Sequence, residues 1–467
     1  MEYLGFDEIV KAIEGEVLVK GDRFDYDGVS TDTRKIEKKN IFIALKGENF
    51  NGNAYMKQAS EKGALICIID EVLFTREEIQ KHTSIIKVKD TRKALLDLAK
   101  YYRSKLNIKV IGITGSTGKT STKDLTASVL SGKYKVFKTE GNFNNEIGLP
   151  LMIFRLDKSY EIAVLEMGMS NLQEIHRMAE VANPDIAIIT NIGISHIENL
   201  KTRENILKAK LEITDFFKEK NVLIVNGDND LLGALKNNKI KIIKTGFENK
   251  WDFYAYDIVL NESDLSFKVI EETTKEEEEI YINLPGKHNI WNALLAIACG
   301  RNLNMSFKEI KEGLKNLQTT AMRLDIIKND SFTIVNDCYN ASPDSMKAAI
   351  DVLIGINGKK KVAVLGTMKE LGKEAYRAHK EVGSYAKENG VDLLIALGEF
   401  DKAFIEGFED SHVEKSIQNS EKQYLKLDNY DEVIDFLLSY LEKEDVVLFK
   451  ASRAMKFEKM VEKLKNN

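Results

Sequence analysis

The most chemically specific segment of the chain reads Thr-Gly-Ser-Thr-Gly-Lys-Thr-Ser, from Thr114 to Ser121. It follows the apolar run 108–113 and precedes a helical stretch, Lys123 to Leu130, so we expect a strand, a glycine loop and a helix. Glycines let backbone N–H groups turn toward phosphate, lysine supplies a cation, and a threonine hydroxyl can bind Mg²⁺. The segment therefore predicts an ATP site formed by Gly115, Ser116, Thr117, Gly118, Lys119, Thr120 and Ser121.

Two further candidate groups stand at the ends of predicted strands. Glu166 ends the apolar run 162–166, and His196 follows the run 186–190. Because ligands collect at the carboxyl ends of parallel strands, we expect both side chains to face the phosphate loop. Mg²⁺ prefers oxygen ligands, so Glu166 is a reasonable partner of Thr120 in a magnesium site. Considered alone, His196 is more often a capping or core histidine.

Later segments supply groups that suit the rest of a nucleotide. Lys210 lies in a stretch of helical spacing, 206–213, where a lysine taken alone is a solvated residue. His288, Asn289 and Asn292 follow Pro285-Gly286 within one turn of a predicted helix start and could stack on and hydrogen-bond a base. Arg323 could pair with phosphate oxygens and Asp337 could accept a hydrogen bond from a ribose hydroxyl, although without the loop both would look like surface groups.

The order of predicted elements indicates an α/β protein of three domains. Strands at 41–45, 64–69 and 84–88 and a helix at 55–62 form a small N-terminal α/β domain, and a helix over 91–104 leads into the phosphate-loop strand. We expect domains at 1–104, 105–318 and 319–467: the small one, a central phosphate-loop domain with a mostly parallel sheet, and a C-terminal Rossmann-like domain. The acidic run 276–279 is expected at a solvated hairpin end.

Composition narrows the class of protein. The chain has 467 residues, 43% of them hydrophobic, and a net charge of -5, which favours neither nucleic acid nor an anionic membrane as partner. The three cysteines, Cys67, Cys299 and Cys338, are far apart and fit a reducing compartment. With no leader or membrane-spanning run in the sequence, we expect a cytoplasmic protein.

Taken together, these motifs resemble the ATP-dependent Mur ligases of peptidoglycan synthesis, across all three predicted domains. The segments that carry the resemblance are 114–121, 142–150, 166–168, 191–198, 209–213 and 286–293. Segments 336–345, 364–372 and 450–453 point to the members that add D-alanyl-D-alanine. The resemblance implies a ligase that joins D-Ala-D-Ala to a UDP-N-acetylmuramoyl-tripeptide through an acyl phosphate and converts ATP to ADP and phosphate. We expect a monomer.

The resemblance also implies roles for residues that match the family pattern. Lys119 would contact the β and γ phosphates, Thr120 and Glu166 one Mg²⁺, and His196 a second Mg²⁺. Lys210 matches a lysine that the family carries as a carbamate. The adenine would lie on His288, Asn289 and Asn292, and Arg323 and Asp337 would reach ATP from the third domain by closure at a hinge near 317–320. The substrates would contact Ser30, Lys46, Asn144, Asn145, Tyr339 and Asn340.

The first predicted domain departs from the family pattern at one point, because Asn51-Gly52-Asn53 stands where Asp-Gly-His is usual. Two alternatives remain at this stage. One is another ligase of the same superfamily, either a diamino-acid-adding Mur ligase or folylpolyglutamate synthase. The other is a phosphate-loop module that uses nucleotide as a switch, which the combination of Glu166, His196 and Lys210 disfavours.

Overall fold

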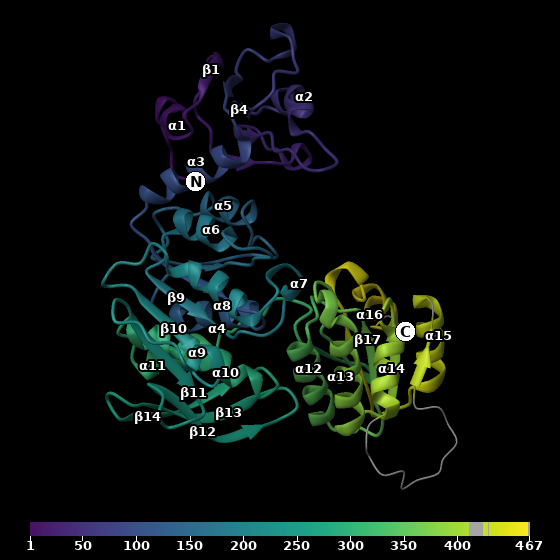
Figure 1. Cartoon of the computed structure of the whole chain (residues 1–467). Coiled ribbons are helices and arrows are strands. Elements are labelled where there is room, and N and C mark those ends of the chain that lie inside the picture. Colours follow the sequence, from purple (N-terminus) through teal and green to yellow (C-terminus); the bar gives the residue numbers. More distant parts are fainter. Residues whose placement is uncertain (411–423, 428, 466–467) are drawn as a thin grey trace. The chain divides into compact units, whose positions relative to one another are not determined.

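The structure is a computed structural model that describes residues 1–410, 424–427 and 429–465. The chain forms two compact units. The first comprises residues 1–114, 134–187 and 211–222, and the second comprises residues 115–133, 188–210 and 223–467. Three α/β regions, each with its own sheet, follow one another along the chain (Figure 1). The three-part α/β architecture expected from the sequence is therefore confirmed.

The N-terminal region is built on a sheet of order β1-β5-β4-β3-β2, in which only β1 is antiparallel to its neighbour. Its strands are short apolar runs, and the predicted strands and helix coincide with β3, β4, β5 and α2. The elements are α1 (Phe6–Ala12), β1 (Glu16–Val19), β2 (Gly28–Ser30), η1 (Thr33–Lys35), β3 (Asn40–Ile43), η2 (Gly52–Tyr55), α2 (Met56–Glu61), β4 (Ile66–Ile69), η3 (Arg76–Glu78), β5 (Ser84–Lys87) and α3 (Thr91–Ser104).

Helix α3 has the bounds that the sequence predicts, and its N-terminal cap explains its start. The Asp90 carboxylate accepts hydrogen bonds from the N–H groups of Arg92 and Lys93, two donors that a helix start leaves without partners. The rest of the first unit contains β6 (Lys109–Thr114), β7 (Val136–Lys138), α5 (Gly148–Ile153), β8 (Ile162–Glu166), α6 (Glu174–Ala182) and η4 (Glu212–Thr214). Strands β6 and β7 both pair with β8 in parallel.

Strands β6 to β14 belong to one nine-stranded sheet. In it β9 (Ile186–Ile189), β10 (Val222–Asn226) and β11 (Lys241–Gly246) precede an antiparallel meander of β12 (Phe253–Leu260), β13 (Leu265–Glu271) and β14 (Glu276–Ile282). The associated helices are α4 (Lys119–Ser131), α7 (Ile197–Leu200), α8 (Arg203–Leu211), α9 (Asp230–Gly233), α10 (His288–Asn302) and α11 (Phe307–Leu314).

The acidic run lies exposed at the end of a hairpin, as expected, but it forms strand rather than turn. Residues 276–279 are the first four residues of β14, directly after the turn 272–275. Two of the glutamates pair with cations from the helices behind the strand, Glu276 with Arg301 and Glu278 with Lys311. Ion pairs with residues distant in the sequence therefore stabilise an acidic segment of low strand propensity in the strand conformation.

The C-terminal region is a three-layer sandwich around the sheet β15-β16-β20-β17-β18-β19, in which only β15 is antiparallel. Alternate strand residues face two separate cores, one under α12, α13 and α14 and one under α15 and α16 (Figure 1). The elements are β15 (Asp325–Lys328), β16 (Phe332–Asn336), α12 (Pro343–Gly355), β17 (Lys361–Gly366), η5 (Gly372–Glu374), α13 (Ala375–Glu388), β18 (Leu393–Leu397), α14 (Asp401–Asp410), β19 (Tyr424–Lys426), α15 (Tyr430–Tyr440), β20 (Asp445–Lys450), η6 (Arg453–Met455) and α16 (Glu458–Lys465).

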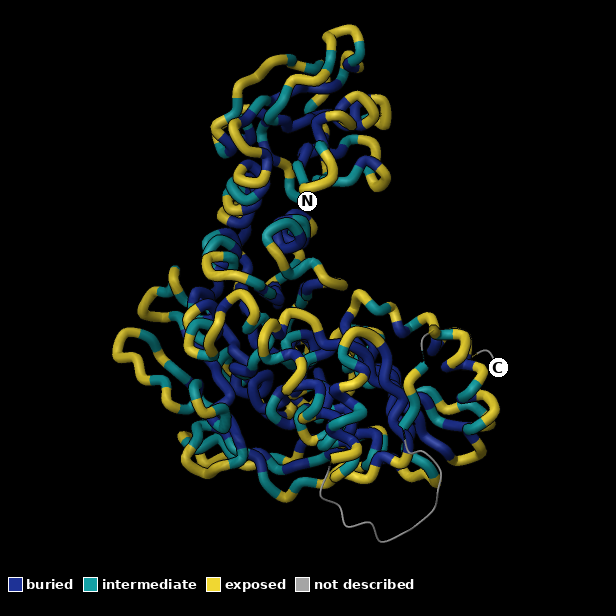
Figure 2. The backbone as a smooth tube through the Cα atoms, turned by 45° about the vertical axis from the view of Figure 1, so that its right-hand side comes forward, coloured by how far each residue is buried: buried dark blue, intermediate teal, exposed yellow. Residues whose placement is uncertain are grey.

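Burial follows this architecture. Figure 2 shows buried residues inside each region and exposed residues at its surface. The predicted boundaries after residues 104 and 318 fall at the end of α3 and between α11 and β15. Across residues 1–410, 424–427 and 429–465, no helix combines the length and the apolar character needed to cross a membrane.

Candidate active site

The phosphate-loop segment forms a tight turn. At two positions other side chains lie so close to its backbone that only glycine fits. Gly118 caps α4 with φ 77°, and a Cβ there would lie 2.7 Å from Oδ1 of Asn292. A Cβ on Gly115 would lie 1.8 Å from Oγ1 of Thr190. Both glycines therefore allow neighbouring side chains to pack directly on the loop backbone.

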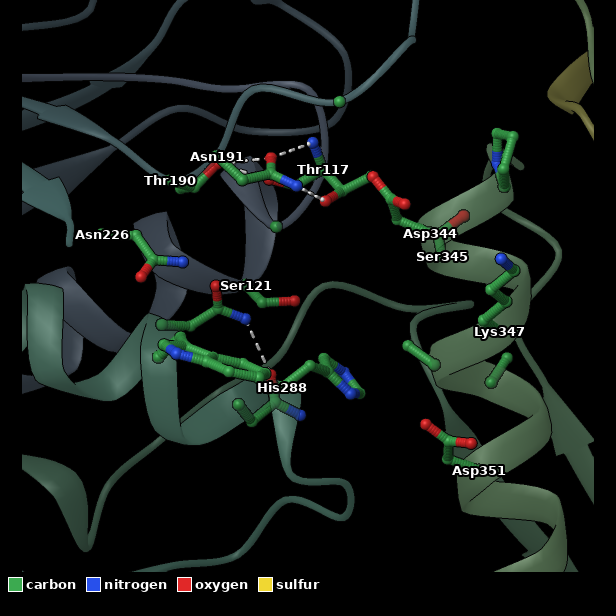
Figure 3. Close-up of a pocket in the computed structure, with 18 of the residues that line it drawn as sticks. Thr117, Ser121, Thr190, Asn191, Asn226, His288, Asp344, Ser345, Lys347 and Asp351 are labelled. Atoms are coloured by element: carbon green, nitrogen blue, oxygen red, sulfur yellow. Dashed lines mark hydrogen bonds between the residues drawn. The ribbon is translucent and has the colours of Figure 1, made fainter. Parts of the chain in front are cut away.

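The loop is held by the segment that follows β9. Asn191 bonds Thr117 twice, because its Oδ1 accepts from the Thr117 N–H at 2.8 Å and its Nδ2 donates to the Thr117 hydroxyl at 2.7 Å (Figure 3). The Thr190 hydroxyl donates to the Thr117 carbonyl, and the Gly193 N–H donates to the Ser116 hydroxyl at 3.0 Å. A cradle fixed in this way needs little reordering when a phosphate binds.

Two lysines of the second unit lie near the loop. The Lys119 ammonium donates to the carbonyl of Gly115 at 2.9 Å. Lys210, on α8, is 1% exposed, and the pKa of its amine is well below the usual value, first because of burial and second because of repulsion from Lys119. The sequence alone favoured a solvated Lys210, whereas the structure buries this lysine, which disfavours its charged form.

Arg323 reaches the loop from the start of the C-terminal region. Its Nη2 donates to the Thr120 hydroxyl at 3.2 Å, and its guanidinium lies 4.2 Å from the centre of the Tyr339 ring. Its Nε is buried without a hydrogen-bond partner among the described residues. An arginine that has an unused N–H donor and lies beside Thr120, the predicted Mg²⁺ ligand, is suited to bind an anion.

The predicted base-binding residues stand in the first turn of α10, as the sequence indicated. Asn289 donates to the Pro285 carbonyl at 2.7 Å, and Asn292 donates to Asn289 at 3.0 Å and accepts from the Thr122 hydroxyl at 3.1 Å. These bonds tie α10 to α4, so much of the hydrogen-bonding capacity of the two amides is used within the protein. Burial lowers the pKa of His288 to about 4, which makes it a neutral ring at pH 7.

A cavity of about 890 Å³ joins these groups within the second unit. Figure 3 shows loop residues on one side and residues of α12, such as Asp344 and Lys347, on the other. Of the residues proposed from sequence for this region, nine line it: Thr117, Gly118, Thr120, Ser121, His288, Asn289, Asn292, Arg323 and Asp337. Asp337 forms a buried ion pair with Lys450, which also lines the cavity and had no role assigned from sequence.

His196 is held against the C-terminal region. Its backbone is left-handed, with φ 65°, and its Nδ1 pairs with the carboxylate of Glu370, whose φ is 63°. The contact with His196 lowers the pKa of Glu370. Glu370 could not be selected from the sequence, since it lies 174 positions from His196 along the chain. Each residue of this pair therefore holds a left-handed backbone conformation that is uncommon outside glycine.

In the first unit, Glu166 ends β8 and is 2% exposed. Its Oε1 accepts from Nδ2 of Asn144 at 2.8 Å, and its own N–H donates to the Thr139 hydroxyl. Asn145 caps the start of α5 by accepting from the N–H of Gly148. A second cavity of about 710 Å³ is lined by Ser30 and Asn145, and not by Asn144 or Lys46.

Lys46 instead belongs to a polar network that explains the departure from the family pattern. Its ammonium pairs with Glu71 at 2.6 Å and with Asp70 at 3.1 Å, and Asn51 donates to Glu71. Asn53 is 2% exposed and its Oδ1 accepts from the N–H of Asp70 at 3.1 Å. Asn51 and Asn53, which stand where Asp and His are usual, therefore hydrogen-bond the residues that directly follow β4.

Three family models match most of the chain. Residues 25–103 match the model of the Mur ligase family catalytic domain, residues 113–300 the Mur ligase middle domain, and residues 322–453 the Mur ligase glutamate ligase domain. The chain belongs to the Mur ligase family.

Relatives within the family cover nearly the full length. The UDP-N-acetylmuramoyl-tripeptide--D-alanyl-D-alanine ligase of Bacillus subtilis (strain 168) is 42% identical, over 94% of this chain and 93% of that protein. The crystal structure of MurF from Acinetobacter baumannii has a TM-score of 0.89 at 29% identity, with 100% of both chains covered. The structure of MurF from Thermotoga maritima in complex with ADP has a TM-score of 0.81 at 28% identity, covering 94% and 97%.

Proposed function

We propose that this chain is an ATP-dependent ligase that joins D-alanyl-D-alanine to the terminal carboxylate of UDP-N-acetylmuramoyl-tripeptide. The observation that carries the proposal is the phosphate loop with Arg323 against Thr120, in a chain 42% identical to a ligase named for that reaction. A structure of a 2,6-diaminopimelate ligase is only 17% identical and shares the fold alone. The cytoplasm, which contains ATP, is the proposed location, and a monomer the proposed state.

The chemistry overcomes the low reactivity of a carboxylate toward an amine. A carboxylate oxygen of the tripeptide attacks the γ phosphorus, and the bond to the departing ADP oxygen breaks. The dipeptide amine, having lost a proton, then attacks the acyl carbon, and the tetrahedral intermediate collapses with phosphate as the leaving group. Lys119, the loop N–H groups and Arg323 would hold the phosphoryl oxygens as charge moves between them.

Mg²⁺ fits the residues available. Across the described part of the chain there is no cluster of three or more His, Cys, Asp or Glu side chains, and Mg²⁺ in a nucleotide site needs few protein ligands because phosphates and waters complete its shell. The Thr120 hydroxyl lines the cavity and is the proposed Mg²⁺ ligand in it. Glu166, His196 and Lys210 are further candidate ligands, because they match the metal-binding positions of the family. Bound Mg²⁺ would neutralise charge on the phosphates.

Lys210 is the proposed site of a carbamate. Its neutral amine nitrogen would attack the carbon of CO₂, forming an N–C bond and releasing one proton. Burial supports the proposal in two ways, because it favours the neutral amine that CO₂ requires and protects the product from water. The product would be an anion beside the Lys119 ammonium.

Oxygen labelling tests the acyl phosphate. With ¹⁸O in both oxygens of the tripeptide carboxylate, we expect each released phosphate to carry one ¹⁸O, read by mass spectrometry, and ADP to carry none. Label found in AMP would show an acyl adenylate instead, and unlabelled phosphate would show hydrolysis of ATP without activation of the acid.

Replacement of Arg323 should separate chemistry from binding. We expect Arg323→Ala to lower kcat about a hundredfold and to change the Kd of ADP by less than about threefold, because the guanidinium would act on charge that develops during transfer. Single-turnover kinetics and calorimetry measure the two quantities, and Arg323→Lys serves as the control that keeps the charge. A large loss of ADP affinity with an unchanged kcat would contradict this role.

A further inference from the structure

One wall of the 890 Å³ cavity is aromatic. Trp291 lies in the first turn of α10, between His288 and Asn292, and lines the cavity together with the loop residues Thr117 and Gly118. No motif in the sequence had pointed to Trp291. The wall therefore places a large flat ring in the same cavity as the phosphate loop.

The orientation of the Trp291 indole is fixed by one carboxylate. Its Nε1 donates to Oδ2 of Asp228 at 2.7 Å, and the same oxygen accepts from the N–H of Phe247 at 2.8 Å. The Phe247 ring packs on the indole with 4.6 Å between the ring centres. Asp228, just after β10, thus ties α10 to the loop after β11, and the ring is already ordered before any ligand binds.

The other tryptophan of the chain belongs to the same cluster but not to the wall. Trp251 donates its Nε1 to Oδ1 of Asp228 at 2.7 Å, so the two indoles bond opposite oxygens of one carboxylate. A Cβ on Gly227 would lie 2.7 Å from the Trp251 ring, which shows how closely the backbone covers it. Trp251 does not line the cavity, and the chain contains only these two tryptophans.

The wall suits a flat, polar-edged ring. The only polar atom of the Trp291 indole is used by Asp228, so its remaining surface is carbon. Asn226, whose Oδ1 accepts from the N–H of Asp228, also lines the cavity and directs its amide into it (Figure 3). A π surface beside an amide is the combination that stacks on a nucleobase and bonds its edge.

We propose that Trp291 is the platform on which the base of the nucleotide packs, with the indole positioned by Asp228. This inference rests on the proposed use of ATP and adds the residue that recognises its base. Trp251 offers a matched control, because its replacement removes an equivalent hydrogen bond to Asp228 and leaves the wall intact.

Fluorescence reports the contact without any turnover. In Trp251→Phe the only indole is Trp291, and we expect its emission to change on titration with ADP along the binding curve measured by calorimetry. In Trp291→Phe the remaining Trp251 should respond by less than about a quarter of that change. If calorimetry shows ADP bound to Trp251→Phe while its emission stays constant, the platform is excluded.

Affinities separate the base from the phosphates. We expect Trp291→Ala to weaken ADP binding about tenfold or more, the range found when a stacked base loses its aromatic partner, and to leave inorganic tripolyphosphate within about twofold. Trp251→Ala should leave ADP within about threefold. Trp291→Phe keeps a ring and should retain ADP within about threefold, which guards against a folding defect in the alanine variant.

Equal losses of ADP affinity in Trp291→Ala and Trp251→Ala would overturn the inference, since the cluster would then be structural. Equal losses of ADP and tripolyphosphate in Trp291→Ala would overturn it as well. Failure of the proposed function looks different, because the wild type would then bind neither ADP nor tripolyphosphate.

Discussion

The variant Lys119→Ala should lower kcat about a thousandfold or more. The Lys119 ammonium is the cation of the phosphate loop and donates to the Gly115 carbonyl at 2.9 Å. In the transfer step it would sit where negative charge shifts between the β and γ phosphates, and a cation fixed at that point stabilises the transition state more than the bound substrate. A phosphate-release assay at saturating substrates measures the effect.

Two controls define the role of Lys119. Lys119→Arg keeps a charge on a longer and wider group, and we expect it to remain at least about tenfold slower than the wild type because the tight loop fixes the point of contact. Thermal unfolding should show that neither variant melts more than about 4 °C below the wild type, because the partly buried Lys119 side chain lies outside the hydrophobic core. Normal turnover in Lys119→Ala would remove the loop from the mechanism.

The variant Lys210→Ala should be inactive, with kcat also about a thousandfold lower, and short carboxylic acids should restore part of the rate. An anionic oxygen ligand supplied by a carbamate is missing in this variant, whereas the space left by a lysine that is 1% exposed can admit acetate or propionate. We expect saturable recovery with acid concentration, measured by the same assay. Methylammonium, which restores an amine but no anion, should not recover activity.

The modification itself has a direct signature. Wild-type protein equilibrated with ¹³C-bicarbonate should show one carbamate resonance near the position typical of lysine carbamates, and Lys210→Ala should lack it. Absence of the resonance in active wild-type protein, together with failure of acid rescue, would exclude the carbamate.

The sequence predicted those parts of the fold whose signals are local. Strand β8 is an unbroken apolar run, and α3 begins at a capping Asp90, so both have the predicted bounds. The acidic strand β14 could not be predicted in this way, because its pairing with Arg301 and Lys311 depends on residues distant along the chain. Short strands such as β15 and β19 carry too little pattern to stand out.

In the candidate site, too, only features contained in one short segment could be predicted from the sequence. Residues of the phosphate loop and of the first turn of α10 were found because type and spacing lie within one short segment. The contact of His196 with Glu370 and the Asp228 cluster were not, since each joins segments far apart in the sequence. Lys46 differs from these residues, because the sequence pattern suggested a contact with substrate. In the fold its ammonium forms ion pairs with Asp70 and Glu71.

Phosphate release with each substrate omitted in turn tests the proposed ligase reaction itself. We predict Mg²⁺-dependent release from ATP only when UDP-N-acetylmuramoyl-tripeptide and D-alanyl-D-alanine are both present, with one dipeptide added to the product for each phosphate. Release at an undiminished rate without the dipeptide, or with no gain of product mass, would contradict the proposed ligase.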